Sequence, residues 1–472
     1  MIRNFTCLDK NLMTPDKSDF WFLPLGGTGE IGMNMNLYGH DGQWLMVDCG
    51  ITFAKPTEEE KALGLPPAAP PVQMADPEFI ASRRESLAGL VITHAHEDHI
   101  GAVAHLWEQL LCPVYTTRFT AEILDRKLKE AGLAKRVIVH IIDPSVRYDI
   151  GVFNLQWVTL THSIPEAYAL AIRTPAAKVF HTADWKLDAD PIIGEPYSEA
   201  DYRAIGDEGM DAMICDSTNA NLKGHSTSEA TLVAGLRQLI QQAPGRVVIS
   251  CFGSNLARLK TLYNIAGECD RHVALLGRSM LNMAAAAKKA GIWTEQSNIV
   301  DSAYLSYMPK NAVVAIATGS QGEPRTALYR LSHDNFYDLA LEPGDTVIFS
   351  SRAIPGNEQD IEALIERLEA MQVTVITQES TDLEIHASGH PAMEELEKMY
   401  RWIRPDMAIP VHGEPLHLKA HGKLANAIGV PRQQVGQNGD IFYIAPYRGI
   451  RRGAVKTGRL GLRNRKLAPI KD

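Results

Sequence analysis

The sequence predicts an α/β protein, and two observations support that prediction. Between about residues 205 and 370, short apolar segments typical of strands alternate with helical stretches, which is the pattern of a mostly parallel sheet. On either side of that region, short apolar segments bounded by turn residues predict further strands. The composition, 45% hydrophobic and 22% charged, argues against a disordered chain, a collagen or a membrane bundle. The length of 472 residues leaves room for about three domains.

Three strands are expected near the N-terminus, in the segments WFLPLG, MNMNLYG and WLMVDCG within residues 21–50. The loop between the first two, Gly27–Gly32, matches the G-x-G-x-x-G pattern of dinucleotide-binding proteins. That pattern needs a helix that starts within the glycines, whereas the residues that follow here alternate apolar and polar up to a hairpin turn at His40–Gly42. We therefore expect a glycine loop that joins two strands, and no dinucleotide site.

The rest of the chain continues this pattern. Residues 56–75 are charged and then proline-rich, so we expect an excursion on the surface. A helix is expected at 100–111, where the apolar residues have helical spacing. The remaining strands are expected at 88–93, 137–142, 153–160, 169–173, 178–181, 212–215, 247–251, 313–317, 346–350, 373–376, 407–410 and 441–444.

The strongest functional signal is the segment Thr93–His99, with the sequence THAHEDH, directly after a predicted strand and before a predicted helix. Residues two apart in an extended segment point the same way, so His94 and His96 can bind one ion. Asp98 and His99, where the chain turns into the helix, can face a second ion. Imidazole and carboxylate ligands without a thiolate are typical of zinc or manganese in an open, water-bearing site.

Further ligands are expected at later strand ends. His162, Asp184 and His412 each lie in a loop just after an apolar strand, and this shared placement predicts that they join the same site. Asp184 can bridge the two ions. Asp48 ends the strand WLMV, and we expect it to orient a ligand histidine rather than to bind metal. The remaining histidines outside the segment HASGH (386–390) show no such placement and are expected to be structural.

The charge and the cysteines indicate which partners the protein can bind and in which compartment it is expected. The net charge of −9 argues against bulk coating of nucleic acid, yet residues 448–472 contain nine Lys and Arg against one Asp. Such a segment can contact phosphates or form a solvated end, and both readings stay open. Six scattered cysteines without C-x-x-C spacing fit reduced thiols in the cytoplasm. Met1–Phe20 shows no export signal, and no stretch has the roughly 18 apolar residues of a membrane span.

The motifs resemble the ribonuclease J group of the β-CASP metallo-β-lactamase nucleases. The segments that carry the resemblance appear in the family's order between about residues 22 and 460: LGGTGEIGMN, DCGITF, THAHEDHIGA, THSIPEA, HTADWKLD, CDSTNA, ATGSQGEP, SSRAIPGNE, HASGH and PVHGE. The resemblance implies an αββα metallo-β-lactamase sandwich formed by residues 1–205 and 371–450. It also implies an inserted α/β β-CASP domain at 206–370. The Lys and Arg residues near the end of the sequence predict a basic tail at 451–472.

The resemblance also implies roles for individual residues. Two divalent metal ions, zinc or else manganese, would be bound, one by His94, His96 and His162, the other by Asp98, His99 and His412, with Asp184 between them. Asp98, Asp216 and His390 would be catalytic, with His390, held by Asp216, protonating the leaving 3′-oxygen. The phosphate-binding residues would be His386, Ser388, Gly389 and His390, together with Ser254, Asn255 and Ser320 of two other loops.

The activity implied by the resemblance is hydrolysis of single-stranded RNA by a hydroxide that two metal ions activate. It would run from 5′ to 3′ on RNA with a 5′-monophosphate, with endonucleolytic cuts besides. Three alternatives stay open: a nuclease of single-stranded DNA, a silent RNA-binding subunit and a small-molecule metallohydrolase. All seven ligands are present, which disfavours the second, and the inserted domain with HASGH disfavours the third. In relatives, a further C-terminal domain contributes to self-association. This sequence ends at Asp472, before that domain, so whether the chain forms a homodimer stays open.

Overall fold

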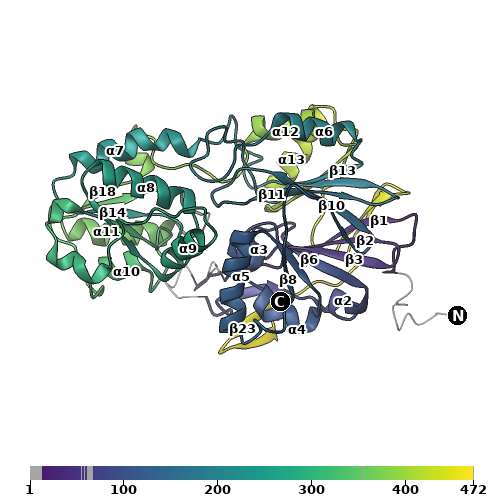
Figure 1. The fold of residues 1–472 in the computed structure, drawn as a ribbon, viewed down its shortest axis with the longest axis horizontal. Helices are drawn as coiled ribbons and strands as arrows, with labels where there is room; N and C mark the ends of the chain where they lie inside the picture. Colours follow the sequence, from purple (N-terminus) through teal and green to yellow (C-terminus); the bar gives the residue numbers. More distant parts are fainter. Residues whose placement is uncertain (1–12, 55, 58, 61–66, 355, 471–472) are drawn as a thin grey trace.

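The chain forms two domains that lie side by side along the long axis of the molecule (Figure 1). This computed structural model describes residues 13–54, 56–57, 59–60, 67–354 and 356–470. We call the two domains the sandwich domain and the inserted domain, because the second interrupts the first in sequence. Parts of the predicted N-terminal segment and of the 56–75 excursion, and the last two residues of the basic tail, lie outside the described residues. No helix in the described part is long and apolar enough to cross a membrane.

The sandwich domain is built on two facing sheets. The eight-stranded sheet has the order β22 (Gly449–Arg451), β21 (Ile441–Ala445), β1 (Phe20–Gly26), β2 (Met35–His40), β3 (Gln43–Val47), β6 (Leu87–Val91), β7 (Val114–Thr116), β8 (Val139–Ile141). The seven-stranded sheet has the order β20 (Arg432–Gln433), β19 (Met407–Val411), β13 (Ala212–Asp216), β12 (Lys178–His181), β11 (Tyr168–Arg173), β10 (Phe153–Thr159), β9 (Tyr148–Ile150).

Apolar side chains between the two sheets form the central core of this domain. Phe22 and Val47 of one sheet belong to the same buried cluster as Leu155, Ile172 and Ile409 of the other. Helices cover both outer faces, so the strands are buried on both sides, and β1 is apolar along most of its length. The helices on the eight-stranded sheet are α2 (Glu78–Ala81), α3 (Glu97–Ile100), α4 (Val103–Leu110) and α5 (Arg118–Glu130). Those on the seven-stranded sheet are α6 (Glu199–Asp207), α12 (Met393–Ile403) and α13 (Pro415–Ala427).

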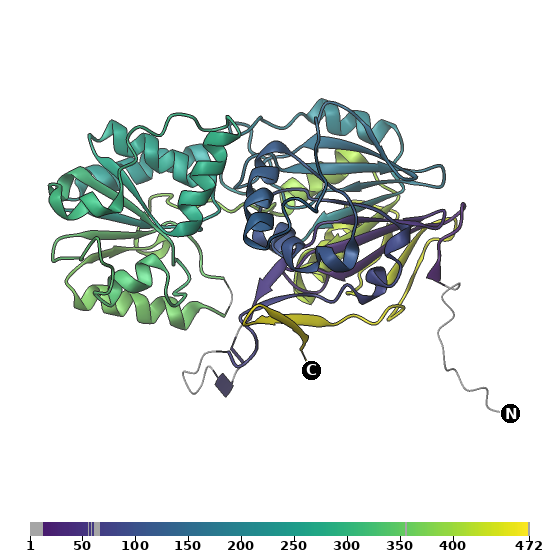
Figure 2. The same ribbon diagram turned by 60° about the horizontal axis from the view of Figure 1, so that its bottom comes forward.

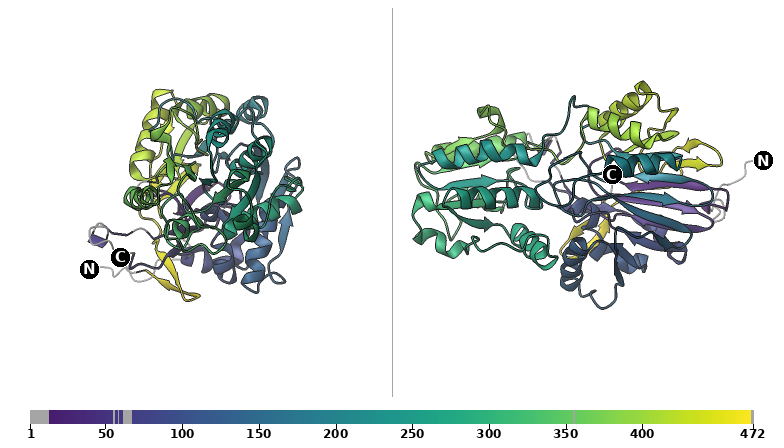
Figure 3. Two further views of the ribbon diagram at one scale, coloured as in Figure 1. Left: turned by 90° about the vertical axis from the view of Figure 1, so that its left-hand side faces the viewer. Right: turned by 45° about the horizontal axis from the view of Figure 1, so that its top comes forward.

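The inserted domain is an open parallel sheet with helices on both faces, as the alternating pattern predicted (Figure 3, right). Its strands have the order β15 (His272–Leu276), β16 (Val313–Ala317), β14 (Val247–Ser250), β17 (Thr346–Phe349), β18 (Thr374–Ile376). One face is covered by α7 (Leu232–Gln242), α8 (Leu256–Glu268) and α9 (Arg278–Lys289). The other face is covered by α10 (Ala327–Ser332) and α11 (Glu358–Ala370).

Strand pairing places the domain boundaries differently from the expected residues 206 and 370. β13, inside the expected insertion, pairs in parallel with β12 and β19 and so belongs to the sandwich domain. β18, beyond the expected end, pairs with β17 and so belongs to the inserted domain. Both strands are short apolar runs that follow a helix, so the sequence pattern alone does not say which sheet each one joins.

The expected elements are otherwise found. Each expected strand lies within three residues of its expected bounds, and no helix follows Gly27–Gly32, which joins β1 to β2. The expected helix at 100–111 is split into α3 and α4. The expected basic tail is folded: β23 (Arg459–Arg463) and β24 (Lys466–Pro469) form a hairpin that pairs with β5 (Val72–Ala75), which in turn pairs with β4 (Ile51–Phe53). Leu460 and Met74, opposite each other in this C-terminal sheet, are buried, which holds the hairpin in place (Figure 2).

Candidate metal centre

The THAHEDH segment is held where the chain leaves β6. Thr93 donates from its backbone nitrogen to the Asp48 carboxylate at 2.8 Å, and the Asn34 backbone nitrogen donates to the Asp98 carbonyl at 2.9 Å. Gly50 packs so closely that a Cβ at this position would lie 1.7 Å from the Asp98 carbonyl oxygen. The segment therefore passes between two neighbouring loops that fix its backbone, and α3 begins within it at Glu97.

Three histidines converge on one point. The Nδ1 atom of His96 lies 3.1 Å from Nε2 of His94 and 3.1 Å from Nε2 of His162. Nitrogen ligands about 2.0–2.1 Å from one tetrahedral zinc ion are themselves roughly 3.3 Å apart. His162 is oriented from behind, because its Nδ1–H donates to the Gly389 carbonyl at 2.6 Å and leaves Nε2 free. These three side chains, with Asp184, have the spacing of a metal site.

A second group shares Asp184 with the first. Asp98, His99, Asp184 and His412 offer ligand atoms that all lie within 4.8 Å of one another. Nε2 of His99 is 3.2 Å from the Asp184 carboxylate, and Nε2 of His412 is 3.2 Å from the Asp98 carboxylate. Asp48 accepts from Nδ1 of His99 at 2.8 Å, which is the orienting contact that its place in the sequence predicted.

A third group extends the site toward the inserted domain. Nδ1 of His390 is 2.8 Å from the Asp216 carboxylate and 4.0 Å from the Asp184 carboxylate. The other Asp216 oxygen accepts from the Thr218 hydroxyl at 2.7 Å, and that hydroxyl is 3.0 Å from Nδ1 of His412. His390 is thus fixed by Asp216 at the edge of the metal cluster, with about a quarter of its side chain exposed.

Burial keeps the first group of histidines neutral. Burial lowers the pKa of His94 and of His162 well below the ordinary value, and it lowers the pKa of His96 to about 4. A neutral imidazole has a free lone pair at the nitrogen that does not carry the proton, which is the form that binds a metal ion.

The second group is dominated by carboxylates. Burial alone would lower the pKa of His99 and of His412, but the nearby carboxylates, Asp184 foremost, outweigh burial and raise both well above the ordinary value. The imidazoles in turn outweigh the effect of burial on Asp98 and Asp184 and hold both pKa values low. This concentration of negative charge calls for a cation, and a divalent metal ion can replace the protons that these histidines would otherwise bind.

The donor set therefore fits divalent metal ions. One oxygen of Asp184, Oδ1, is buried and has no hydrogen-bond partner, although a buried carboxylate oxygen is normally satisfied. Asp184 lies in all three groups, and this oxygen lies 3.4 Å from Nδ1 of His412. A metal ion would satisfy it. All seven predicted ligands are brought together, and none of the other histidines in the described part of the chain, apart from His390, joins a cluster of this kind.

The predicted phosphate-binding residues of the segment HASGH lie beside the third group of the metal centre, to which His390 belongs. Ser388 accepts from the Asn219 amide at 2.9 Å and from the His390 backbone nitrogen at 3.2 Å. His386 is nearly buried, its Nδ1 has no hydrogen-bond partner, and burial, with Arg258 and Arg352 nearby, lowers its pKa to about 3. Gly389 is required by packing, since a Cβ there would lie 2.7 Å from the His162 ring.

The other predicted phosphate residues lie at the carboxyl edge of the inserted domain's sheet. Ser320 follows β16 and is buried, and Ser254 precedes α8. Asn255 has a structural task, because its side-chain oxygen caps α8 by accepting from the Arg258 backbone nitrogen at 2.9 Å. This edge faces the metal centre, as the bond from the Ala257 backbone nitrogen to the Ser163 carbonyl shows.

Several supporting residues gave no signal in the sequence. Thr218 and Asn34 contact ligands through long-range packing that no local pattern reveals. Arg258 is fully buried and donates to Glu229 of η3 (Glu229–Thr231), to the Ser350 carbonyl at 2.8 Å and to the Ile385 carbonyl at 3.4 Å. It therefore ties the start of HASGH to the inserted domain. From the sequence alone, an arginine among the apolar residues of a helix is expected to be exposed, so only the structure reveals this role.

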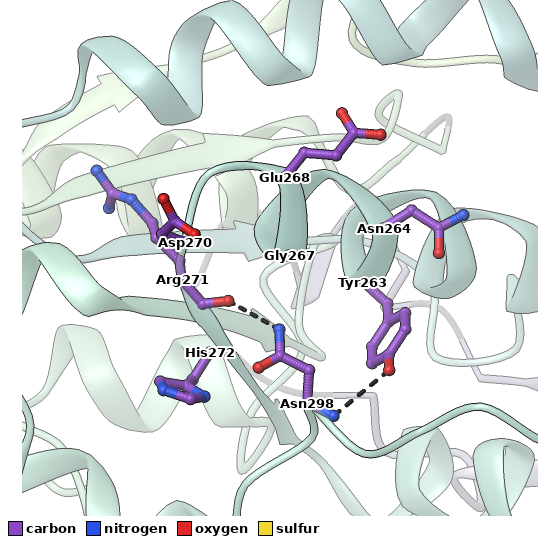
Figure 4. Close-up of a pocket in the computed structure, with 8 residues that line it drawn as sticks. All are labelled: Tyr263, Asn264, Gly267, Glu268, Asp270, Arg271, His272 and Asn298. Atoms are coloured by element: carbon purple, nitrogen blue, oxygen red, sulfur yellow. Dashed lines mark hydrogen bonds between the residues drawn. The ribbon is translucent and has the colours of Figure 1, made fainter.

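One pocket of the structure lies away from the metal centre, and a smaller pocket lies beside it. A pocket of about 650 Å³ lies at the amino ends of the parallel strands, between Tyr263, Asp270 and Asn298 (Figure 4). Two bonds join its lining residues, from the Asn298 amide to the Arg271 carbonyl at 2.8 Å and from the Asn298 backbone nitrogen to the Tyr263 hydroxyl at 3.4 Å. Ligands of open parallel sheets bind at the carboxyl ends instead. A smaller pocket of about 200 Å³ is lined by His162 and by Ile292 of the inserted domain, and so adjoins the metal centre.

Comparison with protein families gives three matches that follow the domains. Residues 29–208 match the metallo-β-lactamase superfamily, and residues 244–368 match the β-CASP domain of ribonuclease J. Residues 384–435 match the RNA specificity domain of zinc-dependent metallo-hydrolases. The sandwich and inserted domains thus have the metallo-β-lactamase and β-CASP folds that the sequence motifs implied.

Curated relatives match over nearly the whole chain. Ribonuclease J of Sinorhizobium meliloti is 41% identical over 429 residues, which are 90% of this chain and 74% of that protein. Ribonuclease J of Mycolicibacterium smegmatis is 37% identical over 440 residues, 92% of this chain and 76% of that protein. A solved structure of a protein of unknown function from Enterococcus faecalis covers 90% of this chain with a TM-score of 0.58 at 16% identity, which shows a shared fold alone.

Proposed function

Because the chain belongs to the ribonuclease J family and is a metal-dependent ribonuclease, we propose that it degrades single-stranded RNA from 5′ to 3′, starting at a 5′-monophosphate, with endonucleolytic cuts besides. The observation that carries the proposal is the third group of the metal centre. There an imidazole that does not belong to the three-histidine group, His390, is held by Asp216 beside the shared ligand Asp184. A metal site built only for structure would need no such side chain.

The ligands would divide as the spacing suggests. His94, His96 and His162 would bind one divalent ion, and Asp98, His99 and His412 the other, with Asp184 in contact with both. Zinc or manganese suits these nitrogen and oxygen ligands. Bound there, the two ions would lower the pKa of water and stabilise the charge that develops on the phosphodiester.

His390 would act as the general acid. The nearby carboxylates, first Asp216, outweigh the effect of burial and raise the pKa of His390, which favours the protonated imidazole. Asp216 accepts from Nδ1 and leaves the Nε2–H free to be donated to the leaving 3′-oxygen. Asp98 and Asp216 would thus support catalysis as ligand and as positioning carboxylate.

The 5′-phosphate would bind at the carboxyl edge of the inserted domain's sheet. Ser350, which follows β17, donates from its hydroxyl to the Ile385 carbonyl just before HASGH, and backbone nitrogens at such strand ends can bind anions. His386 with its free Nδ1, Ser388, Gly389 and Ser320 are the proposed contacts, with Ser254 beside them. Asn255 would act indirectly, by capping α8.

A cleavage time course tests this proposal. One 3′-labelled RNA is supplied with a 5′-monophosphate, triphosphate or hydroxyl, beside DNA of the same sequence and an Asp98→Ala, His99→Ala control. We expect mononucleotides from the monophosphorylated RNA first and no products in the control. Cleavage of the DNA in preference would assign the chain to DNA, and bound metal without any cleavage would favour a silent RNA-binding subunit.

A further inference from the structure

Two sequence features without an assigned role, the glycine loop Gly27–Gly32 and the basic end of the chain, meet in the structure. Arg459, the first residue of β23, forms an ion pair with Glu30 of the glycine loop. Its other terminal nitrogen donates to the Gln73 side-chain oxygen of β5 at 3.0 Å. Only 16% of the Glu30 side chain is exposed, and burial raises its pKa while the Arg459 charge opposes that rise. Loss of Arg459 would therefore leave a nearly buried carboxylate without its cation.

The Glu30 carboxylate in turn holds the glycine loop in shape. The oxygen that does not face Arg459 accepts from the Asn438 amide and from the Gly27 backbone nitrogen. Asn438 also accepts from the Thr28 backbone nitrogen at 2.9 Å. Gly27 has φ of +83°, and glycine reaches this region and many others at little cost. Because the glycines leave the backbone free to adopt other conformations, these side-chain contacts select the one that the loop has.

The glycine loop holds the backbone of the proposed ligand His412. The His412 backbone nitrogen donates to the Gly27 carbonyl at 2.7 Å, and the Gly413 backbone nitrogen donates to the Glu30 carbonyl at 3.0 Å. His412 has φ of +49°, a conformation that costs energy in a residue other than glycine and persists only where the surroundings impose it. Nε2 of His412 lies 3.2 Å from the Asp98 carboxylate. A shift of the glycine loop would therefore displace this nitrogen from the second group.

The three-histidine group is held by different contacts. Nδ1 of His162 donates to the Gly389 carbonyl, and Nδ1 of His94 lies 3.1 Å from the Thr93 hydroxyl. Among the described residues, no hydrogen bond joins His94, His96 or His162 to the glycine loop or to β23. The two groups of ligands therefore depend on different parts of the protein.

We propose that Arg459 is a positioning residue for the second group: through Glu30 it holds the glycine loop in the shape that places His412. Groups that orient metal ligands from behind typically contribute about 10- to 100-fold to metal affinity. Arg459, from the basic end of the chain, would then act on the protein itself rather than on a phosphate. This inference rests on the proposed function, because it uses the division of ligands proposed above.

The affinities for the two metal ions test the inference. The variants are Arg459→Met, Arg459→Lys and the double variant of Arg459→Met with Glu30→Gln. The matched control, Arg463→Met, removes the same charge from the other end of β23, where the side chain donates to the Ala68 carbonyl at 2.7 Å. Metal-free protein is titrated with zinc in competition with a chelator, which gives one dissociation constant for each ion. Urea unfolding of the metal-free proteins is measured alongside.

We expect Arg459→Met to raise one of the two dissociation constants roughly 10- to 100-fold and to leave the other within about threefold, because only the second group depends on the glycine loop. Arg459→Lys should cause a smaller rise, since lysine keeps the charge but lacks the fork that also reaches Gln73. The double variant should bind the affected ion more tightly than Arg459→Met does, because no unpaired charge is then left beneath the loop.

Two dissociation constants equal to those of Arg463→Met would overturn the inference. Equal weakening of both ions would overturn it as well, because that is the effect of a general loss of stability. A single bound ion in the unaltered protein would contradict the proposed division of ligands, and the inference with it. Two bound ions without cleavage of RNA by the unaltered protein would contradict the proposed function alone, and the measured affinities would still decide the inference.

Discussion

His390 is distinguished from the ligand histidines by what surrounds it. His94, His96 and His162 face one another, and burial lowers their pKa values, whereas His390 faces Asp216, which raises its pKa. Both kinds of histidine follow from the sequence motifs, because strand ends and the family resemblance indicated them. The contact that separates them, between residues 174 positions apart, arises only in the folded chain.

Replacing His390 by alanine should therefore leave metal binding unchanged and remove the proposed general acid. We expect His390→Ala to retain two metal ions per chain, measured by mass spectrometry of the metal, and to lose about 10²- to 10⁴-fold in turnover. His272→Ala, which alters an exposed histidine at the start of β15, is the control. A rate within threefold of the unaltered protein would exclude His390 as the general acid.

At the scale of elements, the site consists of loops that leave strand ends. The sequence indicated those ends well, since apolar runs locate β6, β12 and β19, and the polar residues that follow them are the proposed ligands. It could not indicate which loops pass closest to one another. Gly50 is an example, because only the packing shows that its α-carbon lies against the backbone of Asp98.

Gly50→Ala should weaken metal binding without removing a ligand. A Cβ 1.7 Å from the Asp98 carbonyl oxygen cannot be accommodated unless the ligand loop moves. We expect metal affinity to fall roughly 10- to 100-fold, as when groups that orient ligands are lost. Affinity is measured by competition with a zinc chelator. Gly449→Ala serves as control, since nothing lies within 4 Å of a Cβ there, and equal affinities for the two variants would contradict the account.

The packing of α13 against α12 and β13 makes stability depend on pH. His421 of α13 is buried between the Ser217 hydroxyl and the Tyr400 hydroxyl, each 2.8 Å away, and burial lowers its pKa to about 4. The unfolded chain, with a pKa of about 6.5 for this group, binds the proton first as pH falls. The stabilisation is therefore complete above pH 6.5 and is lost between about pH 6.5 and 4.

Glutamine does not titrate, so His421→Gln should remove the part of the pH dependence of stability that comes from His421. Between pH 7 and pH 5, the free energy of unfolding should fall by about 2 kcal/mol more for the unaltered protein than for the variant. Urea unfolding at both pH values gives the difference, and pH effects common to both proteins cancel. Equal losses for the two proteins would show that His421 titrates normally.

At the scale of the whole molecule, a buried ion pair ties the two domains to the start of the HASGH segment. Arg258 and Glu229 are buried, and their neighbours include Ser350 at the end of β17 and Ile385 before HASGH. Asp188 of the sandwich domain accepts from the Glu229 backbone nitrogen at 3.1 Å, which continues the network across the domain boundary. The sequence predicted both domains but not this junction, because its members are spread from residue 188 to residue 385.

Arg258→Met should destabilise the protein by about 3–5 kcal/mol, because it leaves Glu229 buried without its partner. The double variant with Glu229→Gln should recover much of that loss, since the unpaired charge is then gone. Urea unfolding of the three variants and the unaltered protein gives the coupling. Strictly additive effects would mean that the two side chains do not stabilise the junction as a pair.

We propose that the ribonuclease activity of this chain requires both metal ions of the cluster. Metal-free protein is titrated with zinc or manganese, and cleavage of 5′-monophosphorylated RNA is measured against the metal bound per chain. We predict little cleavage up to one ion per chain and full activity as the second ion binds, because the ligands form two groups that share Asp184. Full activity with a single ion, or two bound ions without cleavage, would contradict the account.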